Sequence, residues 1–363
     1  MTHRVINFNA GPGALPLSAL ERAQCELLDF EATGMSIMEH SHRGEDYQRV
    51  HFEALSLIAE LLAVPDTHQV LLLPGGARMQ FAMLPMNLRT DRHAGDYVIT
   101  GLWAKVAYEE ARTVGSPSIA CDVGVDGQYD RVPNQAELRL SSDAPYVHIT
   151  SNNTLYGTQF QSYPDTGAIP LVADMTSDLL WRPLDVAKFG AIYAGAQKNI
   201  GPAGVSVVVM RNDLIERGRR DIPMFFRYVA HAHENSLYNT APTFPIYMVR
   251  NVLQWLKELG GLAAIEQRNR VKAARLYEVI DASDGFYRSA IEKDSRSIMN
   301  VVFRLSSDTL DQRFIRAAHA AGMVGLKGHR LVGGIRASIY NAVSVESVET
   351  LAQFMQHFQR ANG

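Results

Sequence analysis

The stretch Gly190-Ala-Ile-Tyr-Ala-Gly-Ala-Gln-Lys-Asn-Ile-Gly-Pro-Ala-Gly204 holds one lysine, Lys198, between two apolar segments. Residues 191–194 and 205–210 are expected to be short buried strands. The small glycine and alanine neighbours leave room for a ligand beside the ammonium group. Burial can lower the pKa of such a lysine, so that the amine acts as a nucleophile or base. The alternative that this stretch leaves open is a solvated lysine on a surface turn.

Outward from that stretch, short apolar segments alternate with amphipathic ones. Strands are expected at 70–73, 96–100, 118–120, 146–150 and 169–173, and helices at 16–34, 45–62, from 75 onward and at 103–114. This order predicts an α/β fold, in which a large domain has a mostly parallel sheet sandwiched by helices.

The pattern changes near residue 244. Helices at 244–259 and 262–282 precede a strand, helix, strand and helix at 299–305, 310–321, 335–340 and 345–360. These elements predict a small C-terminal α+β domain. We therefore expect three parts: an N-terminal arm at 1–15, a large domain at 16–260 and a small domain at 261–363.

The composition excludes several classes of partner. The 363 residues are 47% hydrophobic and 20% charged with a net charge of −3, which disfavours nucleic acid or an anionic membrane as partner. Cys25 and Cys121 show neither a disulfide framework nor metal-ligand spacing, so no metal is expected. The polar N-terminus and the lack of an apolar run of about 18 residues predict no signal peptide, no membrane span and a cytoplasmic location.

Asp174 and Lys198 each follow a predicted strand. In parallel sheets, ligands bind outside the carboxyl ends of the strands, so the acid and the amine are expected at one edge. A salt bridge between them is one reading. The other is a site for pyridoxal phosphate, which requires an acid beside its pyridinium nitrogen and a lysine that binds it covalently.

Such a cofactor also needs a phosphate site and a surface for its ring. Pro74-Gly-Gly-Ala-Arg78 opens a predicted helix, whose free amides can bind phosphate, although the motif is neither a Walker P-loop nor GxGxxG. Trp103 begins the next predicted helix and could stack on the ring or belong to the core. Thr154 could donate to a ring oxygen, or it could serve in a turn.

Positive side chains recur in the predicted loops. The candidates are His42, Arg43, Arg78, His329, Arg330 and the strand residue Arg336. Each could be an ordinary solvated or ion-paired group. If they converge, they could bind a substrate with two anionic ends, because arginine binds a carboxylate through two parallel hydrogen bonds.

Motifs along nearly the whole chain carry a resemblance to a known family. They are Asn7-Phe-Asn-Ala-Gly-Pro12, Ser41-His-Arg-Gly44, residues 75–81, residues 193–204, Tyr238-Asn-Thr-Ala-Pro-Thr-Phe244 and Lys327-Gly-His-Arg-Leu-Val-Gly-Gly-Ile-Arg-Ala-Ser-Ile-Tyr-Asn341. Together they resemble the phosphoserine aminotransferases, class-V pyridoxal-phosphate enzymes of fold-type I. Two departures are Ala77, where the family often has glycine, and Asn153, where it more often has glutamate.

The resemblance implies a role for each candidate. Lys198 would be the Schiff-base lysine, Asp174 the partner of the pyridine nitrogen, Trp103 the stacking residue and Thr154 the partner of the 3′-oxygen. The cofactor phosphate would be held by Ala77, Arg78 and Gln197, and by Asn239 and Thr240 of the neighbouring subunit of a homodimer with shared active sites. Arg336 would anchor the substrate carboxylate. The substrate phosphate, or the distal carboxylate of glutamate, would meet His42, Arg43, Arg78, His329 and Arg330.

The implied reaction is the reversible transamination of 3-phosphohydroxypyruvate with L-glutamate, which gives O-phospho-L-serine and 2-oxoglutarate in serine biosynthesis. The family also aminates 3-hydroxy-2-oxo-4-phosphobutanoate in pyridoxal phosphate biosynthesis, and the sequence leaves open whether this chain does both. One alternative is an aminotransferase that uses serine or alanine with glyoxylate. Another is a non-catalytic pyridoxal-phosphate-binding regulator, which the lack of a helix-turn-helix stretch or basic arm before the fold disfavours.

Overall fold

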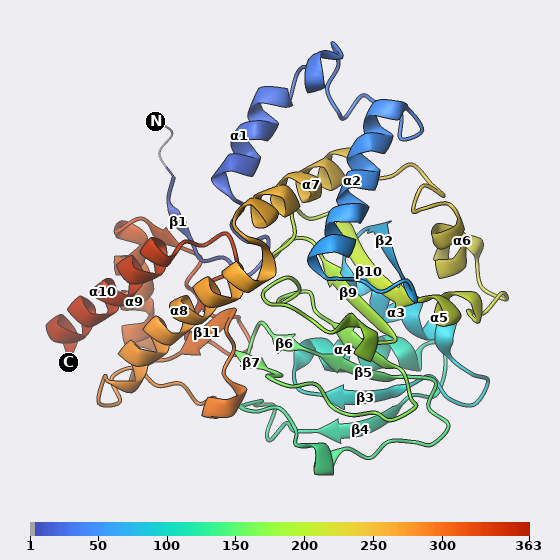
Figure 1. The fold of residues 1–363 in the computed structure, drawn as a ribbon. Coiled ribbons are helices and arrows are strands. Elements are labelled where there is room, and N and C mark those ends of the chain that lie inside the picture. The colour runs from blue at the N-terminus through green and yellow to red at the C-terminus, as the bar shows by residue number, and fades with distance from the viewer. Residues whose placement is uncertain (1–3) are drawn as a thin grey trace.

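A seven-stranded sheet with helices on both faces forms the larger part of the molecule (Figure 1). The computed structural model describes residues 4–363. In spatial order the strands are β2 (His68–Pro74), β10 (Val205–Arg211), β9 (Ala191–Gly195), β8 (Leu171–Asp174), β5 (Val147–Thr150), β3 (Asp96–Ile99) and β4 (Ser118–Asp122). From β9 to β4 all neighbours are parallel, while β10 is antiparallel to both β9 and β2. The predicted α/β fold with a mostly parallel sheet is confirmed.

Two layers of helices cover the sheet. One contains α1 (Leu17–Glu26), α2 (Glu45–Leu61) and α7 (Thr243–Glu258), and the other contains α3 (Ala77–Leu88), α4 (Leu102–Arg112), α5 (Asn212–Glu216) and α6 (Tyr228–His233). Successive strand residues point to opposite faces. Accordingly, Leu72 packs in the core with α2 and α7, while Leu71 and Leu73 pack in the core with α3 and α4. Both faces of β2 are therefore buried, which explains its unbroken apolar run.

The C-terminal part gathers beside the N-terminal strand, where red and blue segments lie together in Figure 1. It contains α8 (Gly261–Asp281), β11 (Asn300–Phe303), α9 (Asp308–Ala320), β12 (Met323–Val324), β13 (Ile335–Ser338) and α10 (Val345–Asn362). Strand β1 (Ile6–Asn7) pairs with β12, and Phe8 is buried in the core of this part. Helix α8 contributes Leu262 to the sheet core and Leu276 to the C-terminal core. The proposed division into domains at 260/261 stays a prediction.

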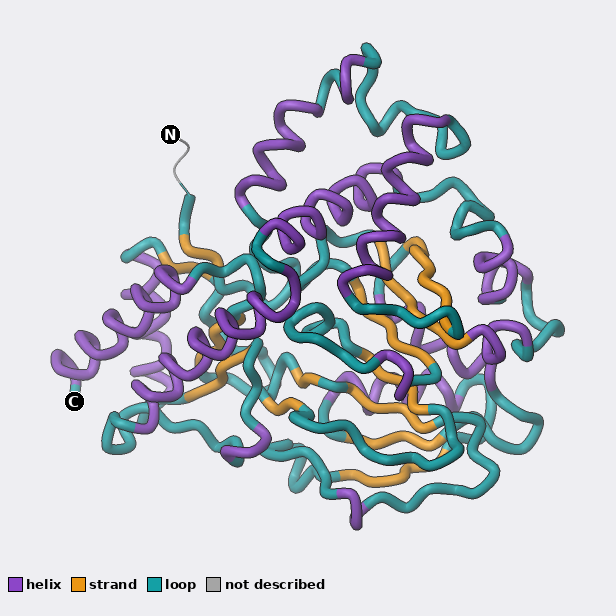
Figure 2. The backbone as a smooth tube through the Cα atoms, viewed as in Figure 1, coloured by secondary structure: helices purple, strands orange, loops and turns teal. Residues whose placement is uncertain are grey.

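Short elements connect these layers, as the backbone trace in Figure 2 shows. Strands β6 (Asn152–Asn153) and β7 (Thr158–Gln159) form a small hairpin after β5. The 3-10 turns are η1 (Phe30–Ala32), η2 (Gln135–Glu137), η3 (Val186–Lys188), η4 (Met224–Phe226) and η5 (Lys293–Ser295). Within residues 4–363, none of the helices has the length and apolar character needed to cross a membrane.

The predicted helix at 16–34 is shorter in the structure. Helix α1 ends at Glu26, and the chain continues through η1, where Glu31 and Ala32 have φ of 49° and 61°. The Asp29 carboxylate accepts a hydrogen bond of 2.7 Å from the amide of Gly34. Aspartate that bonds a nearby backbone amide offers the chain an alternative to the helix. The sequence pattern missed this competition because Phe30 is buried as a helical residue would be.

Candidate active site

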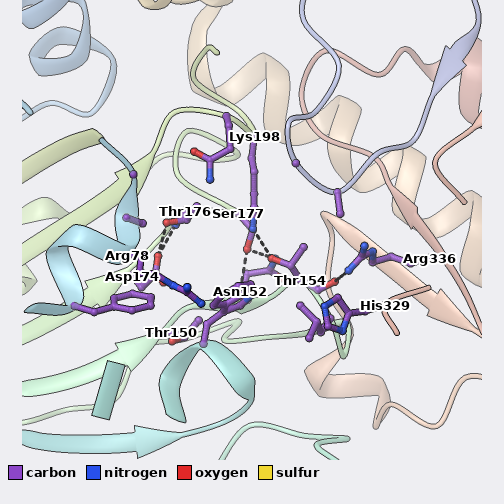
Figure 3. Close-up of a pocket in the computed structure, with 18 residues that line it drawn as sticks. Arg78, Thr150, Asn152, Thr154, Asp174, Thr176, Ser177, Lys198, His329 and Arg336 are labelled. Atoms are coloured by element: carbon purple, nitrogen blue, oxygen red, sulfur yellow. Dashed lines mark hydrogen bonds between the residues drawn. The ribbon is translucent and has the colours of Figure 1, made fainter. Parts of the chain in front are cut away.

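A cavity of about 370 Å³ lies at the carboxyl edge of the sheet, and its lining residues are drawn in Figure 3. Strands β2, β3, β5 and β8 end beside it, and the connection from β9 to β10 forms part of its wall. It brings together these residues proposed from sequence: Ala77, Arg78, Trp103, Thr154, Asp174, Gln197, Lys198, His329 and Arg336. The direction of the strands explains this convergence. Strands β2, β3, β5, β8 and β9 all run the same way, so their carboxyl ends meet at one edge of the sheet.

Lys198 lies on the turn that joins β9 to β10. Its Nζ donates a hydrogen bond of 2.6 Å to Thr154 Oγ1. A Cβ atom on Gly11 would lie 3.4 Å from Lys198 Cε, so the N-terminal arm packs directly against the lysine stem. Burial lowers the pKa of Lys198 to about 8, with a smaller lowering by Arg336, while Asp174 opposes the shift. A useful fraction of the amine, about a tenth, is therefore neutral at pH 7.

Asp174 is the last residue of β8 and is 5% exposed. Its Oδ1 accepts hydrogen bonds of 2.9 Å and 2.6 Å from the Thr176 amide and hydroxyl. Burial raises the pKa of Asp174, whereas these two hydrogen bonds and the charge of Lys198 lower it. Thr176 also accepts a 3.2 Å hydrogen bond from the amide of Gly195, which ties the carboxylate to the end of β9. The sequence pattern assigns Thr176 no role, although a threonine two residues after a strand-end aspartate is a recognisable turn signal.

The N-terminus of α3 opens into the cavity. Ala77 and Arg78 occupy the first turn, where backbone amides have no acceptor within the helix. A Cβ atom on Gly76 would meet nothing within 4 Å, so there is free space beside these amides. Amides that point into open space at a helix N-terminus suit a phosphate group. This part of the site therefore fits the phosphate of pyridoxal phosphate.

Two further side chains border the same space. Trp103 lies in the first turn of α4, and the Arg78 guanidinium lies 5.8 Å from the centre of its ring. The Gln197 side chain packs so closely on Gly195 that a Cβ atom there would lie 2.5 Å from Gln197 Oε1. An aromatic face, an amide side chain, an amine and a carboxylate around one cavity make up the donor set that the cofactor requires.

Arg336 and His329 lie on the side of Lys198 away from Asp174 (Figure 3). Arg336 Nη1 donates a hydrogen bond of 3.2 Å to the Thr154 carbonyl, and its buried Nε has no partner within residues 4–363. An unpaired buried guanidinium nitrogen suits an anionic ligand. Burial and the charges of Arg336 and Arg330 lower the pKa of His329. A neutral His329 can therefore accept or donate a hydrogen bond beside the guanidinium.

Five proposed residues lie outside this cavity. His42 and Arg43 belong to the loop before α2, and Asn239 and Thr240 belong to the segment between α6 and α7. Arg330 is exposed and lines a separate hollow with Arg304 and Asp308, although its neighbour His329 lines the cavity. Their assignments stay predictions.

The cavity also contains residues that the sequence left without a role. They are Ala10, Gly11, Phe81, Thr150, Asn152, Leu155, Thr176 and Ser177, while Gly76 comes from the predicted phosphate motif. Ala10 and Gly11 come from the motif Asn7–Pro12, which carried the resemblance without an assigned contact. Their place in the wall depends on the pairing of β1 with β12, which no local signal predicts.

Comparisons with known proteins agree with this geometry. The family model described as "Aminotransferase class-V" matches residues 5–351. The phosphoserine aminotransferase of Lysinibacillus sphaericus (strain C3-41) is 51% identical over 360 residues, which cover 99% of both chains. The solved structure of the phosphoserine aminotransferase from Bacillus circulans subsp. alkalophilus has a TM-score of 0.97 and 51% identity, with 100% of both chains covered.

A more distant solved structure carries the cofactor. It is the PLP-bound phosphoserine aminotransferase from Trichomonas vaginalis, with a TM-score of 0.92 and 38% identity over 97% of this chain and 100% of that one. With a family model matched over nearly the whole chain and relatives at about half identity, this chain belongs to the class-V aminotransferases.

Proposed function

We propose that this protein is a pyridoxal-phosphate-dependent phosphoserine aminotransferase. It transfers the amino group between L-glutamate and 3-phosphohydroxypyruvate, which gives 2-oxoglutarate and O-phospho-L-serine in serine biosynthesis. The observation that carries the proposal is the cavity in which the Lys198 amine lies between the buried carboxylate of Asp174 and the guanidinium of Arg336. Full-length relatives of that name at 51% identity support it. A cytoplasmic location is also part of the proposal.

The cavity residues suit pyridoxal phosphate one by one. Lys198 would bind it covalently, and Asp174 would pair with its pyridine nitrogen. Trp103 would stack on the ring and Thr154 would contact the 3′-oxygen. The phosphate would be held by the amides of Ala77 and Arg78 and by the side chain of Gln197. When bound, the cofactor supplies an electron sink for the carbanion that forms when the substrate loses its Cα proton.

The chain's own groups supply the remaining chemistry. Lys198 Nζ takes the proton from the Cα atom of the amino acid and returns a proton to that position when the reaction runs in reverse. Its lowered pKa, about 8, keeps the base close to the working pH. Asp174 holds a negative charge beside the pyridine nitrogen. Arg336 binds the substrate carboxylate and so fixes the Cα atom within reach of Nζ.

The far end of the substrate carries a phosphate or a second carboxylate, which positive side chains would bind. We assign it to His329 and Arg78, together with His42, Arg43 and Arg330. His42 and Arg43 lie outside the cavity of their own chain, as do Asn239 and Thr240. A homodimer in which Asn239 and Thr240 complete the phosphate site of the neighbouring subunit accounts for that position. The same pocket suits 3-hydroxy-2-oxo-4-phosphobutanoate, which we propose as a second substrate in pyridoxal phosphate biosynthesis.

The experiment that tests this function follows the visible absorption of the bound cofactor. Phosphoserine should convert the cofactor to its amine form, and 2-oxoglutarate should restore the original spectrum. No conversion with phosphoserine would contradict the function. A stronger response to alanine or serine with glyoxylate would instead favour an aminotransferase for unphosphorylated substrates.

A further inference from the structure

We propose that Asn199 and Asn341 are positioning residues, which set the distance between Arg336 and Lys198 through a buried chain of amide hydrogen bonds. The inference rests on the proposed function, because it takes Arg336 as the carboxylate anchor and Lys198 as the covalent lysine. The inference gives no new role to Arg336 or Lys198 themselves. Asn199 follows Lys198 in the chain, and Asn341 lies a few residues beyond the end of β13, the strand that carries Arg336.

The direct link joins these two asparagines. The backbone amide of Asn341 donates a hydrogen bond of 3.0 Å to Asn199 Oδ1. Asn199 Nδ2 in turn donates 3.1 Å to the carbonyl of Leu179, in the loop that follows Asp174. One side chain therefore ties the Lys198 turn to both the C-terminal part of the chain and the loop after β8.

Asn341 extends the chain of hydrogen bonds on its own side. Its Nδ2 donates 2.9 Å to the Leu180 carbonyl, and its Oδ1 accepts 2.8 Å from Asn269 Nδ2 on α8. Asn269 also donates 3.2 Å to the carbonyl of Trp181. All three asparagines are at most 5% exposed. Buried polar groups of this kind are costly to leave unpaired, and each side-chain amide atom of the three asparagines except Asn269 Oδ1 has a partner.

A second buried group holds the backbone around Asn341. Lys272 lies one turn further along α8 than Asn269, and its Nζ donates to the carbonyls of Ile339, Tyr340 and Val343 at 2.8–2.9 Å. The chain on both sides of Asn341 is therefore fixed to α8. The Asn199 side chain then transmits that position to the Lys198 turn. Without it, the segment after β13 loses its direct hydrogen bond to the Lys198 turn, while Arg336 keeps its link to the lysine through Thr154.

This role predicts a particular kinetic defect in Asn199→Ala. Arg336 holds the carboxylate in both the bound and the reacting state and also fixes the Cα atom near Lys198 Nζ, so a displaced anchor should raise KM and lower kcat as well. We expect KM for phosphoserine and for 2-oxoglutarate to rise about tenfold, because a displaced guanidinium binds the substrate carboxylate less tightly. The dissociation constant of glutarate, a dicarboxylate without an amino group, should rise by the same factor when measured by calorimetry on the holoenzyme.

The matched control is Asn87→Ala. Asn87 is also a buried asparagine, 2% exposed, which bonds the carbonyls of Met83 and Phe226 far from Lys198. It should lower the thermal unfolding temperature without changing the glutarate affinity. If Asn199→Ala also loses stability but binds glutarate as the wild type does, the asparagine is merely structural and the proposal is wrong.

Asn341→Ala provides a second reading if Asn199→Ala does not fold. This variant keeps the backbone amide that donates a hydrogen bond to Asn199 Oδ1, but it loses the side-chain bonds to Leu180 and Asn269. Like Asn199→Ala, it should raise the dissociation constant of glutarate. Wild-type enzyme that binds glutarate but does not turn over phosphoserine would contradict the proposed function and leave this inference intact. If the wild type turns over phosphoserine and both variants bind glutarate as tightly as the wild type does, only this inference is contradicted.

Discussion

Thr154 contacts Lys198 and Arg336 at once, because its hydroxyl accepts a 2.6 Å hydrogen bond from Lys198 Nζ and its carbonyl accepts a 3.2 Å hydrogen bond from Arg336 Nη1. The residue lies on the turn between β6 and β7, just beyond the carboxyl end of β5. A single hairpin therefore separates the proposed covalent lysine from the proposed carboxylate anchor. The Lys198 amine bonds the side-chain hydroxyl of Thr154, whereas the Arg336 guanidinium bonds its backbone carbonyl. A substitution of the Thr154 side chain can therefore remove the first contact and keep the second.

Thr154→Val should lower the pKa of Lys198 below its present value of about 8. The substitution preserves shape but removes the acceptor that stabilises the charged amine, an effect of about one pKa unit. The pH dependence of cofactor recombination with apo-protein measures the change. Thr154→Ser keeps a hydroxyl and should keep the wild-type midpoint. Equal midpoints in Thr154→Val and the wild type would show that the hydrogen bond does not set the lysine pKa.

The wild-type apo-protein should capture pyridoxal phosphate faster as the pH rises, and the rate should level off above pH of about 8. Burial disfavours the charged amine, and only the neutral amine attacks the aldehyde. An ordinary lysine would keep gaining up to a pH of about 10.4. The rise in absorbance after mixing gives the rate, and Lys198→Ala should show no covalent capture at any pH. A rate still rising at pH 10 would contradict a lowered lysine pKa.

The strand ends could be placed from the sequence because they depend on local pattern. Apolar runs followed by polar residues put Asp174 and Lys198 at one edge of the sheet, and the structure brings both to the same cavity. The path of a loop depends on distant contacts instead. His329 and Arg330 are adjacent in sequence but line different hollows, in a loop that turns at Gly333 and Gly334 with φ of 74° and 66°.

Contacts between distant segments could not be predicted from the sequence either. The Asn199–Asn341 hydrogen bond joins residues far apart in the chain, and nothing in either neighbourhood indicates a partner. The contact of Gly11 with the Lys198 stem likewise depends on where β1 pairs. Periodicity predicts which elements form, whereas such contacts follow only once those elements have packed.

Asp174→Asn should reduce kcat by about 10²–10³, the range seen when one preorganised electrostatic group is removed. The amide keeps the size and an acceptor for Thr176 but loses the negative charge. It should also lower the pKa of Lys198, because the Asp174 charge raises that pKa. Asp122→Asn is the control, since Asp122 also ends a strand but lies outside the cavity. Single-turnover absorbance with phosphoserine measures the rate, and a loss equal to that of the control would exclude the role.

Gly76→Val should weaken cofactor binding without unfolding the protein. Gly76 has an extended backbone with φ of −119°, which any residue can adopt, and its missing Cβ faces open space. A valine there would fill the volume beside the Ala77 and Arg78 amides, and the dissociation constant of the cofactor should rise at least about tenfold.

Gly75→Val is the control, because it should affect stability and not primarily cofactor binding. Gly75 has φ of 89°, which strains a β-branched residue, so this variant should lose thermal stability. Equilibrium titration of apo-protein with pyridoxal phosphate and thermal melts separate the two effects. Unchanged cofactor affinity in Gly76→Val would place the phosphate elsewhere.

Mixed dimers can test whether Asn239 and Thr240 act on the neighbouring subunit. Lys198→Ala alone should be inactive, and the double variant Asn239→Ala/Thr240→Ala alone should bind the cofactor weakly. In a mixed dimer, the subunit that keeps Lys198 receives native Asn239 and Thr240 from its partner, so one complete site forms. Unfolding and refolding a 1:1 mixture should therefore restore about half of the wild-type activity to the mixed species, since one of its two sites is intact. Activity no higher than the sum of the separate variants would mean that each chain builds its phosphate site alone.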